Sequence, residues 1–510
     1  MIRLALAAGL VWLVLVLPDR PALPTAARLP AELPLLLLVP ALLGRAGQAL
    51  AAGALWLLAV QKLADIAMHE ALGRGFNAWG DLPLLGAGLE LLEGAAGPLA
   101  PPLAMLGAGL AAIALAAALW WACGVWRRLP GRAPQLGLAL LAGVLALVGP
   151  ARFDAAAYAG AKLRLNAQTS AALAQFRAAA AEDALAARPG LFAALDRDLL
   201  LIFVESYGRT SLSTPLYAPT HLATLAEAEA ALAAAGLAMR SGIIGAPTRG
   251  GQSWLSHATL AQGLRIDDQA RYRAALVSGR RSLFHHAQAA GLPTAAVMPA
   301  ITRPWPEASR MGFDRILAAG DLGYRGLPFN WVTMPDQFTL AATDRLLRDQ
   351  PRTRPLVAQT ALISSHAPWV PVPQLVPWEE LGDGRIFDAM AAAGDPPAVV
   401  WRDRDRVRAQ YRAAIDYSLR VVMDYARRHA ADPPLLVVLG DHQAAPGIAL
   451  DERAEVPLHL IGPAHLLARF DHPDLSPGLI PPDGAAVIPM EALRDLILVA
   501  LASAGPAGAE

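Results

Sequence analysis

Residues 198–206 read DLLLIFVES, a short and nearly continuous apolar run that ends in two polar residues. A strand covered on both faces of a sheet has this pattern, because neither of its faces meets solvent. Further strand-like runs lie at residues 292–300, 356–365, 435–441 and 456–463, and helical stretches at 223–236, 336–350 and 405–430. This alternation predicts an α/β domain with a mainly parallel sheet covered by helices on both faces.

Three of the predicted strands end in side chains suited to catalysis. Glu205 ends the first run, His366 follows another in SSHAPW, and Asp441-His442 ends a third in LLVVLGDH. Ligands of an open α/β sheet bind at the carboxyl ends of its strands, so these residues should meet at one site. Carboxylate and imidazole groups without thiolate suit Zn²⁺, Mn²⁺ or Mg²⁺, which predicts a metal site. Each residue also has a structural interpretation, since an acid at a strand end often caps the next helix.

A serine flanked by glycines opens a predicted helix in GGQSWLSHATLAQG, residues 250–263. Ser253 has two interpretations, as the N-cap of the helix, where serine is favoured, or as a nucleophile. The two are compatible, because a helix N-terminus also offers free N–H groups to an anion. A metal beside this serine would lower the pKa of its hydroxyl, so Ser253 is a candidate metal ligand as well.

The composition divides the chain into two parts. Hydrophobic residues make up 55% of the 510 residues and the mean hydropathy is +0.38, more than a soluble globular protein needs. The apolar excess lies in residues 1–150. The 43 basic and 43 acidic side chains balance, which argues against a nucleic-acid partner. The single cysteine, Cys123, excludes an intramolecular disulfide and a thiolate metal cage.

Apolar segments in this first part predict a bundle of about five membrane-spanning helices, since about 20 apolar residues cross a bilayer core. The segments lie near residues 2–18, 32–46, 48–68, 99–124 and 134–151, and the second is short for a span. A cleaved signal peptide is the competing interpretation of the first, although the segments that follow disfavour it. Arg127, Arg128 and Arg132 mark a cytoplasmic loop, so everything after residue 152 should lie outside.

The predicted organisation is therefore a transmembrane domain at residues 1–152, a helical linker at 153–190 and a catalytic domain at 191–510. The predicted location is a bacterial-type inner (plasma) membrane, crossed several times, with the catalytic domain on the extracytoplasmic, periplasmic side. A polar stretch near Asp65 is predicted to form a loop outside the lipid core, either facing head groups or simply solvated.

The order of these motifs resembles that of the alkaline phosphatase and sulfatase superfamily. VESYGR is similar to the first metal-binding strand of that superfamily, LISSHAPW to the substrate-histidine motif of its membrane-bound transferases, and VVLGDHQ to their late Asp-His metal pair. With the apolar segments in front, the chain resembles lipoteichoic acid synthases and phosphoethanolamine transferases. The resemblance covers residues 195–465 by motif and residues 1–150 by architecture.

The resemblance leaves two hydroxyl groups as candidates for the nucleophile. The transferases use threonine, which would favour Thr248 in APTRGG. Ser253 is preferred, because Ser256 and His257 stand where the superfamily has polar residues, and because QSWLSHATLAQG resembles the serine segment of cofactor-independent phosphoglycerate mutases. A true sulfatase is disfavoured, since Leu255 and His257 replace the proline and the arginine of the formylglycine signature.

The function implied by the resemblance is a metal-dependent phosphotransferase. It would move a phosphoglycerol or phosphoethanolamine head group from a membrane lipid to an envelope glycan or lipid acceptor through a serine-linked intermediate. His366 and His257 would hold the phosphoryl oxygens or protonate the leaving group. Two other functions stay open, a membrane-anchored sulfatase-like phosphoesterase of a soluble phosphate or sulfate ester, and a non-catalytic sensor or scaffold.

The resemblance also implies residues that bind the substrate. ITRPWPEASRMGFDRIL, residues 301–317, is similar to the segment in which lipoteichoic acid synthases place a tryptophan and an arginine against the donor phosphate. Trp305 and either Arg303 or Arg310 are the candidates, with packing as the alternative role for each. Trp254, next to Ser253, is assigned to substrate binding with them.

Overall fold

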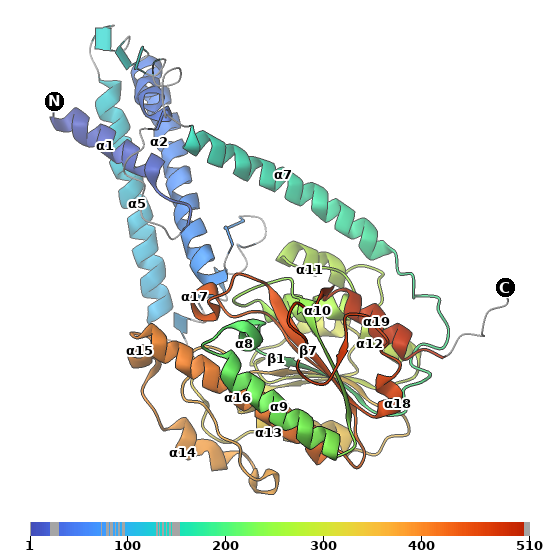
Figure 1. The fold of residues 1–510 in the computed structure, drawn as a ribbon. Coiled ribbons are helices and arrows are strands. Elements are labelled where there is room, and N and C mark those ends of the chain that lie inside the picture. The colour runs from blue at the N-terminus through green and yellow to red at the C-terminus, as the bar shows by residue number, and fades with distance from the viewer. Residues whose placement is uncertain are drawn as a thin grey trace. The chain divides into compact units, whose positions relative to one another are not determined.

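A computed structural model describes residues 2–20, 30–72, 74–77, 97–128 and 153–503, and scattered positions between 81 and 144. The chain forms two compact units, Met1–Leu173 and Ala174–Glu510. In Figure 1 the first unit contains the blue and cyan helices, whereas the second contains the whole sheet.

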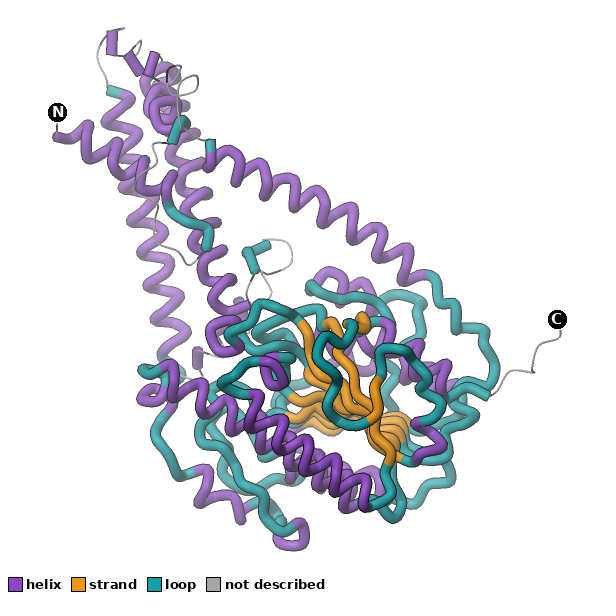
Figure 2. Tube along the Cα trace, in the orientation of Figure 1, coloured by secondary structure: helices purple, strands orange, loops and turns teal. Residues whose placement is uncertain are grey.

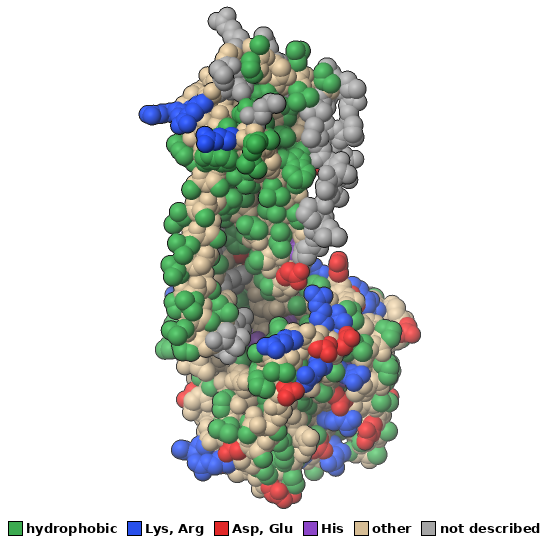
Figure 3. Space-filling model, turned by 90° about the vertical axis from the view of Figure 1, so that its left-hand side faces the viewer, with side chains coloured by type: hydrophobic (Ala, Val, Ile, Leu, Met, Phe, Trp, Pro, Cys, Tyr) green, Lys and Arg blue, Asp and Glu red, His purple; other side chains and the backbone are tan. Residues whose placement is uncertain are grey.

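Long helices build the N-terminal unit. They are α1 (Ile2–Val16), α2 (Glu32–Leu72), α5 (Ala100–Arg127) and the first part of α7 (Asp154–Ala181). By length and composition alone, α2 and α5 are apolar enough to cross a membrane, and α1 is a shorter apolar helix. Many leucines of these helices are exposed, and Figure 3 shows hydrophobic side chains along the unit. Such a surface fits lipid better than water.

The predicted bundle of five spans is matched only in part. The predicted segments 32–46 and 48–68 both lie in α2, whose two helical stretches meet at a kink at Gly44, where φ is 61° and ψ is −132°. After the kink, the side chain of Gln48 donates to the carbonyl of Trp120 on α5 at 2.9 Å. The predicted span at 134–151 falls mostly outside the described residues.

Asp65 lies within α2 rather than in the predicted polar loop, and it is buried. Its carboxylate accepts hydrogen bonds from the Phe76 N–H at 2.7 Å, the Tyr158 hydroxyl at 2.5 Å and Lys162 Nζ at 2.7 Å. These bonds join the residues after α2 and the first turns of α7 to one buried carboxylate.

The C-terminal unit is built on one nine-stranded sheet in the order β4-β3-β5-β1-β6-β7-β2-β8, with β9 paired to β2. The strands are β1 (Leu199–Val204), β2 (Ala238–Gly245), β3 (Thr294–Met298), β4 (Arg315–Ala318), β5 (Val357–Leu362), β6 (Leu435–Gly440), β7 (Glu455–Gly462), β8 (Ser476–Pro477) and β9 (Val487–Pro489). The strands from β4 to β6 are parallel, whereas β7 runs antiparallel to both of its neighbours. The prediction of an α/β domain is confirmed, and its sheet is mixed.

Helices cover both faces of this sheet, and Figure 2 shows the strands at the centre of the unit with helices around them. The helices are α8 (Thr210–Ser213), α9 (Ala218–Ala234), α10 (Ser253–Gln262), α11 (Gln269–Leu276), α12 (Leu283–Ala289), α13 (Asp336–Thr343), α14 (Asp388–Ala391), α15 (Pro397–Val400), α16 (Arg404–Arg428), α17 (Pro446–Ala449), α18 (Ala464–Leu467) and α19 (Ala492–Ala500). Ile202 of β1 shares a core with α9, α13 and α16, whereas Phe203, the next residue, packs against α10. Successive residues of a strand point to opposite faces, so β1 is covered on both sides.

Candidate active site

The loop between β2 and α10 follows an uncommon backbone path. Gly250, Gly251 and Gln252 all have positive φ, with values of 71°, 146° and 68°. Glycine adopts such values easily, but a left-handed conformation costs a residue with a side chain roughly 1–2 kcal/mol. Gln252 is the N-cap residue of α10, so Ser253 is the first residue of the helix and not its cap. The sharp turn places the Ser253 hydroxyl at the helix N-terminus.

Ser253 faces the predicted metal ligands. Its Oγ donates a hydrogen bond to Glu205 Oε2 at 3.0 Å and lies 3.3 Å from His442 Nε2. The competing hydroxyl, that of Thr248, is buried and has no hydrogen-bond partner among the described residues. This geometry favours Ser253 as the nucleophile.

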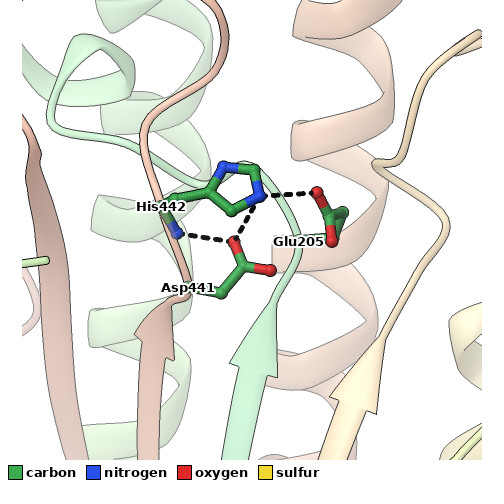
Figure 4. A group of neighbouring side chains, drawn as sticks. All are labelled: Glu205, Asp441 and His442. Carbon is green, nitrogen blue, oxygen red and sulfur yellow. Dashed lines mark hydrogen bonds and ion pairs between the residues drawn. The ribbon is translucent and has the colours of Figure 1, made fainter. Parts of the chain in front are cut away.

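Glu205, Asp441 and His442 form a buried cluster at the carboxyl ends of β1 and β6 (Figure 4). The register explains why they meet, because Val204 pairs with Gly440 and the residues that follow leave the sheet together. One ligand atom from each of the three lies within 4.8 Å of the others. His442 Nε2 is 3.2 Å from Glu205 Oε1 and 3.8 Å from Asp441 Oδ1.

The charges of this cluster call for a cation. Burial and the neighbouring Glu205 carboxylate raise the pKa of Asp441 to about 8. Burial disfavours the charged form of His442, but the Asp441 and Glu205 carboxylates outweigh it and raise the pKa of His442 to about 9. Two buried carboxylates beside an imidazole are a donor set for a divalent ion, whose charge would offset their repulsion. The residues therefore fit a metal ion.

Two serines that the sequence analysis missed hold the ligands in place. Ser206 has a φ of 56°, and its N–H donates to Asp441 Oδ1 and its hydroxyl to Glu205 Oε1, both at 2.8 Å. Ser365 donates to the backbone carbonyl of Glu205 at 2.6 Å. The position of Ser206 directly after a ligand at a strand end is a signal that could have identified it.

His366 follows β5 and stacks on Trp331, with the ring centroids 3.9 Å apart and the planes at 23°. Its Nδ1 donates to the Ala367 carbonyl at 2.6 Å, which leaves Nε2 available for a ligand. Trp331 stands in a tight turn in which Phe329 and Val332 exchange backbone hydrogen bonds and Asn330 has a φ of 56°. No motif surrounds Trp331, so nothing in the sequence marks it as part of the site.

His257 lies one turn after Ser253 on α10, and its ring packs on Phe203 of β1 with the centroids 4.1 Å apart. Burial lowers its pKa to about 4 against the opposing effect of the Glu205 carboxylate. Its Nε2 is buried and has no hydrogen-bond partner within the described part of the chain. A neutral, enclosed imidazole is poorly suited to donate a proton, and the role of His257 toward the phosphoryl oxygens stays a prediction.

The predicted substrate-binding residues lie on α10 and in the loop after β3. Trp254 donates its indole N–H to α11 at 3.1 Å, and Trp305 packs in the loop after β3. Arg303 and Arg310 are exposed in the same loop, Arg310 at the end of the short helix η1 (Pro306–Arg310). Among the described residues, no hydrogen bond, ion pair or ring contact links Trp254, Trp305 or Arg310 to Ser253 or the metal-ligand cluster. Their role stays a prediction.

No protein-family model and no curated protein matches the chain. Solved structures that match it include the lipoteichoic acid synthase of Listeria monocytogenes, at 12% identity over 65% of this chain and 79% of that chain, with a TM-score of 0.41. A protein of the alkaline phosphatase superfamily from Vibrio parahaemolyticus matches at 14% identity over 65% and 74%, with a TM-score of 0.38. The soluble domain of lipooligosaccharide phosphoethanolamine transferase A from Neisseria meningitidis matches at 13% identity over 62% and 89%, with a TM-score of 0.39. The function proposed below rests on the residues of this chain.

Proposed function

We propose that the chain is a metal-dependent phosphotransferase that takes the head group of a membrane phospholipid, of phosphoglycerol or phosphoethanolamine type. The acceptor would be a hydroxyl of an envelope glycan or lipid. The observation that carries the proposal is the hydroxyl of Ser253, 3.0 Å from Glu205 beside a buried set of metal-ligand side chains. A hydroxyl next to such ligands suits attack on a phosphodiester with a covalent intermediate.

Glu205, Asp441 and His442 would hold a divalent ion with Ser253 Oγ as a further donor. When bound, Mn²⁺, Zn²⁺ or Mg²⁺ lowers the pKa of a hydroxyl and neutralises phosphoryl charge. The chain itself supplies orientation, since Ser206 hydrogen-bonds both carboxylates. Ligands held in this way need no rearrangement during the reaction.

In the first half-reaction, the bond from Ser253 Oγ to phosphorus forms and the bond from phosphorus to the diacylglycerol oxygen breaks. The serine proton leaves Oγ along its hydrogen bond to Glu205 Oε2 and passes on to water, because the lowered pKa of Glu205 keeps that carboxyl ionised. His366 enters this step protonated at both ring nitrogens, with Nδ1–H bonded to the Ala367 carbonyl, and the leaving oxygen takes its Nε2 proton. The N–H groups at the start of α10 would face the phosphoryl oxygens. In the second half-reaction the acceptor hydroxyl attacks phosphorus, the bond to Ser253 breaks, and the two protons return along the same groups.

The apolar helices support a lipid as the donor. α2 and α5 are long and apolar enough to anchor the chain in a membrane, and Arg127 and Arg128 at the end of α5 favour a cytoplasmic position for that end. With the predicted span at residues 134–151 crossing once more, the catalytic unit would act on the extracytoplasmic side of a bacterial-type inner membrane. Tethering raises the effective concentration of lipid head groups without any additional contact.

The proposal is tested with the full chain reconstituted in vesicles of phosphatidylglycerol and phosphatidylethanolamine with Mn²⁺, by measuring the release of diacylglycerol. Ser253→Ala and Glu205→Gln should each lower the rate on the order of 1,000-fold or more, as loss of a nucleophile or its activating group does. Thr248→Ala is the matched control and should stay within about threefold of the parent rate. A chelator should abolish release and added Mn²⁺ should restore it.

Release that survives in Ser253→Ala would contradict the assignment of the nucleophile. Cleavage of a soluble phosphate monoester with no release of diacylglycerol would instead identify a hydrolase of soluble esters. A chain that binds the metal and cleaves neither substrate would support the sensor or scaffold.

A further inference from the structure

An exposed apolar surface lies at the start of α16. Val399 in α15 and Trp401 after it are 40% and 51% exposed, and Leu450 directly after α17 is 49% exposed. Arg408, near the start of α16, donates to the carbonyl of Gly447 at 3.0 Å. This bond holds α17 beside the N-terminal end of α16, next to α15 (Figure 1). Val399, Trp401 and Leu450, together with Arg402 and Arg404, are referred to as the α15–α17 surface.

The charge around these apolar side chains is slightly positive. Residues 395–408 contain four arginines and three aspartates. Arg406 pairs with Asp395, and Arg408 pairs with Asp405. The exposed side chains of Arg402 and Arg404 have no ion-pair partner among the residues that the structure describes. The α15–α17 surface therefore offers arginine to an anionic partner.

Trp401 is held rigidly next to the proposed active site. Its ring stacks on that of Trp369, with the centroids 5.9 Å apart and the planes at 8°, and its indole N–H donates to the Pro368 carbonyl at 3.2 Å. Trp369 is buried and packs edge-on against Tyr411. Pro368 comes two residues after His366, so the exposed indole of Trp401 contacts the loop that carries the proposed proton donor.

Tryptophan and aliphatic side chains beside arginine are the composition of a surface that lies at the head-group level of a membrane. A stable protein interface commonly uses about 20–30 residues a side, far more than this small surface offers. We propose that the α15–α17 surface binds the head-group layer of an anionic bilayer and thereby brings His366 and Ser253 to the lipid phosphates. This inference rests on the proposed function and names the surface through which the catalytic unit meets its donor.

Site-specific fluorescence in the full chain tests the inference. Cys123, the single cysteine, is replaced by serine, and one new cysteine is introduced as Val399→Cys or, for the control, Thr353→Cys. Thr353 is exposed before β5, at the amino-terminal edge of the sheet. Each cysteine carries an environment-sensitive dye in vesicles of equal parts phosphatidylcholine and phosphatidylglycerol, with or without nitroxide-labelled lipid.

Nitroxide lipid should quench the dye at position 399 at least about threefold more than the dye at position 353, since quenching requires insertion at the head-group layer. Adding Trp401→Ser should reduce quenching at position 399. Equal quenching at the two positions would overturn the inference. A blue shift at position 399 without quenching would overturn it too, because the chain's own helices would then cover the surface.

The same samples separate this inference from the proposed function. Release of diacylglycerol without preferential quenching at position 399 keeps the transferase and rejects the surface. Preferential quenching without release keeps the surface and rejects the transferase. When both hold, Trp401→Ser should slow cleavage of bilayer lipid at least about threefold and leave cleavage of a soluble phosphodiester unchanged.

Discussion

Gln252 adopts a left-handed backbone conformation directly before the residue that faces the metal-ligand cluster. A residue that carries a side chain is strained in that backbone conformation, and such strain persists only where the surrounding structure enforces it. Here two glycines precede Gln252 and a helix follows it, so the turn has little freedom to relax. The position of the Ser253 hydroxyl thus depends on backbone geometry as much as on its own contacts.

Trp331 gives a test at the scale of one residue. Trp331→Ala should lower kcat for diacylglycerol release about two- to tenfold, because a stacked aromatic pair contributes about 0.5–1.5 kcal/mol to the placement of His366. Trp331→Phe should keep most of the rate, since the ring stack remains. Trp378→Ala, which removes an indole bonded to Asp424, is the control and should leave kcat unchanged. An unaltered kcat in Trp331→Ala would show that the stack does not position His366.

The metal-ligand candidates could be predicted from sequence, whereas the residues around them could not. Glu205, Asp441 and His442 each end an apolar run, and the carboxyl ends of parallel strands meet at one edge of a sheet. Ser206 acts partly through its backbone N–H, and Trp331 reaches His366 through a tight turn. Such contacts depend on the tertiary placement of loops, which leaves no periodic pattern in the sequence.

At the scale of the element, helix α10 has a residue with a left-handed backbone conformation at each of its ends. It begins after Gln252 and ends at Gly263, whose φ is 61° and whose N–H bonds to the Thr259 carbonyl. A Cβ at Gly263 would lie 2.6 Å from Nε of Arg494. Arg494 is fully buried and bonded to Asp183, so it has little room to move away.

Gly263→Ala should therefore lower the thermal unfolding midpoint of the chain in detergent. The left-handed backbone alone should cost roughly 1–2 kcal/mol, and the collision with Arg494 adds to it. Gly236→Ala is the matched control, because Gly236 ends α9 with a φ of 82° and its Cβ would meet no atom within 4 Å. Equal shifts of the midpoint in the two variants would show that the collision with Arg494 carries no cost.

The elements that could be predicted are those with a continuous pattern. Each of the five apolar runs that were predicted as strands forms one, and these strands are β1, β3, β5, β6 and β7. β2 was missed, because Arg240, Ser241 and Gly242 interrupt its apolar sequence and its pairing with β7 is what makes it a strand. β4 has four residues, too few to show a period. The direction of β7 could not be predicted, since antiparallel pairing leaves no mark on a strand that is buried on both faces.

At the scale of the whole molecule, a buried ion pair ties the segment before the sheet to the C-terminal helix of the second unit. Arg494 Nη2 of α19 lies 2.9 Å from Asp183 Oδ1, and both side chains are almost fully buried. Burial works to raise the pKa of Asp183, but the guanidinium of Arg494 outweighs it and holds the pKa below its usual value. A carboxyl whose pKa is lower in the folded chain than in the unfolded chain stabilises the fold at pH values above the unfolded pKa. This stabilisation is lost as the pH falls through the pKa of the folded chain.

Asp183→Asn should therefore lower the thermal unfolding midpoint at pH 7. Removing one partner of a buried pair costs about 3–5 kcal/mol, because the other charge stays buried. The difference from the parent protein should shrink as the pH falls from about 4, where the unfolded chain takes up the proton, to the lower pKa of the folded chain. Asp196→Asn, which breaks an exposed pair with His465, is the control and should change the midpoint little at either pH. A difference that is independent of pH would contradict the role assigned to the charge of Asp183.

The two-part organisation could be predicted from composition, because apolar residues gather in the first 150 positions. Two helices there are long and apolar enough to cross a membrane, and α2 takes in two of the segments that were predicted as separate spans. Gly44 has non-helical φ and ψ and separates two helical stretches of α2, and hydropathy does not show whether such stretches cross a membrane separately. The number of crossings stays a prediction.

The most direct test of the central claim is the mass of the full chain after incubation with vesicles of phosphatidylglycerol and phosphatidylethanolamine and Mn²⁺. The account predicts a mass increase equal to phosphoglycerol or phosphoethanolamine, located on the peptide that contains Ser253. The increase should be absent in Ser253→Ala and present in Thr248→Ala. An adduct that survives in Ser253→Ala and disappears in Thr248→Ala, or a metal-loaded chain that forms no adduct, would contradict transfer through Ser253.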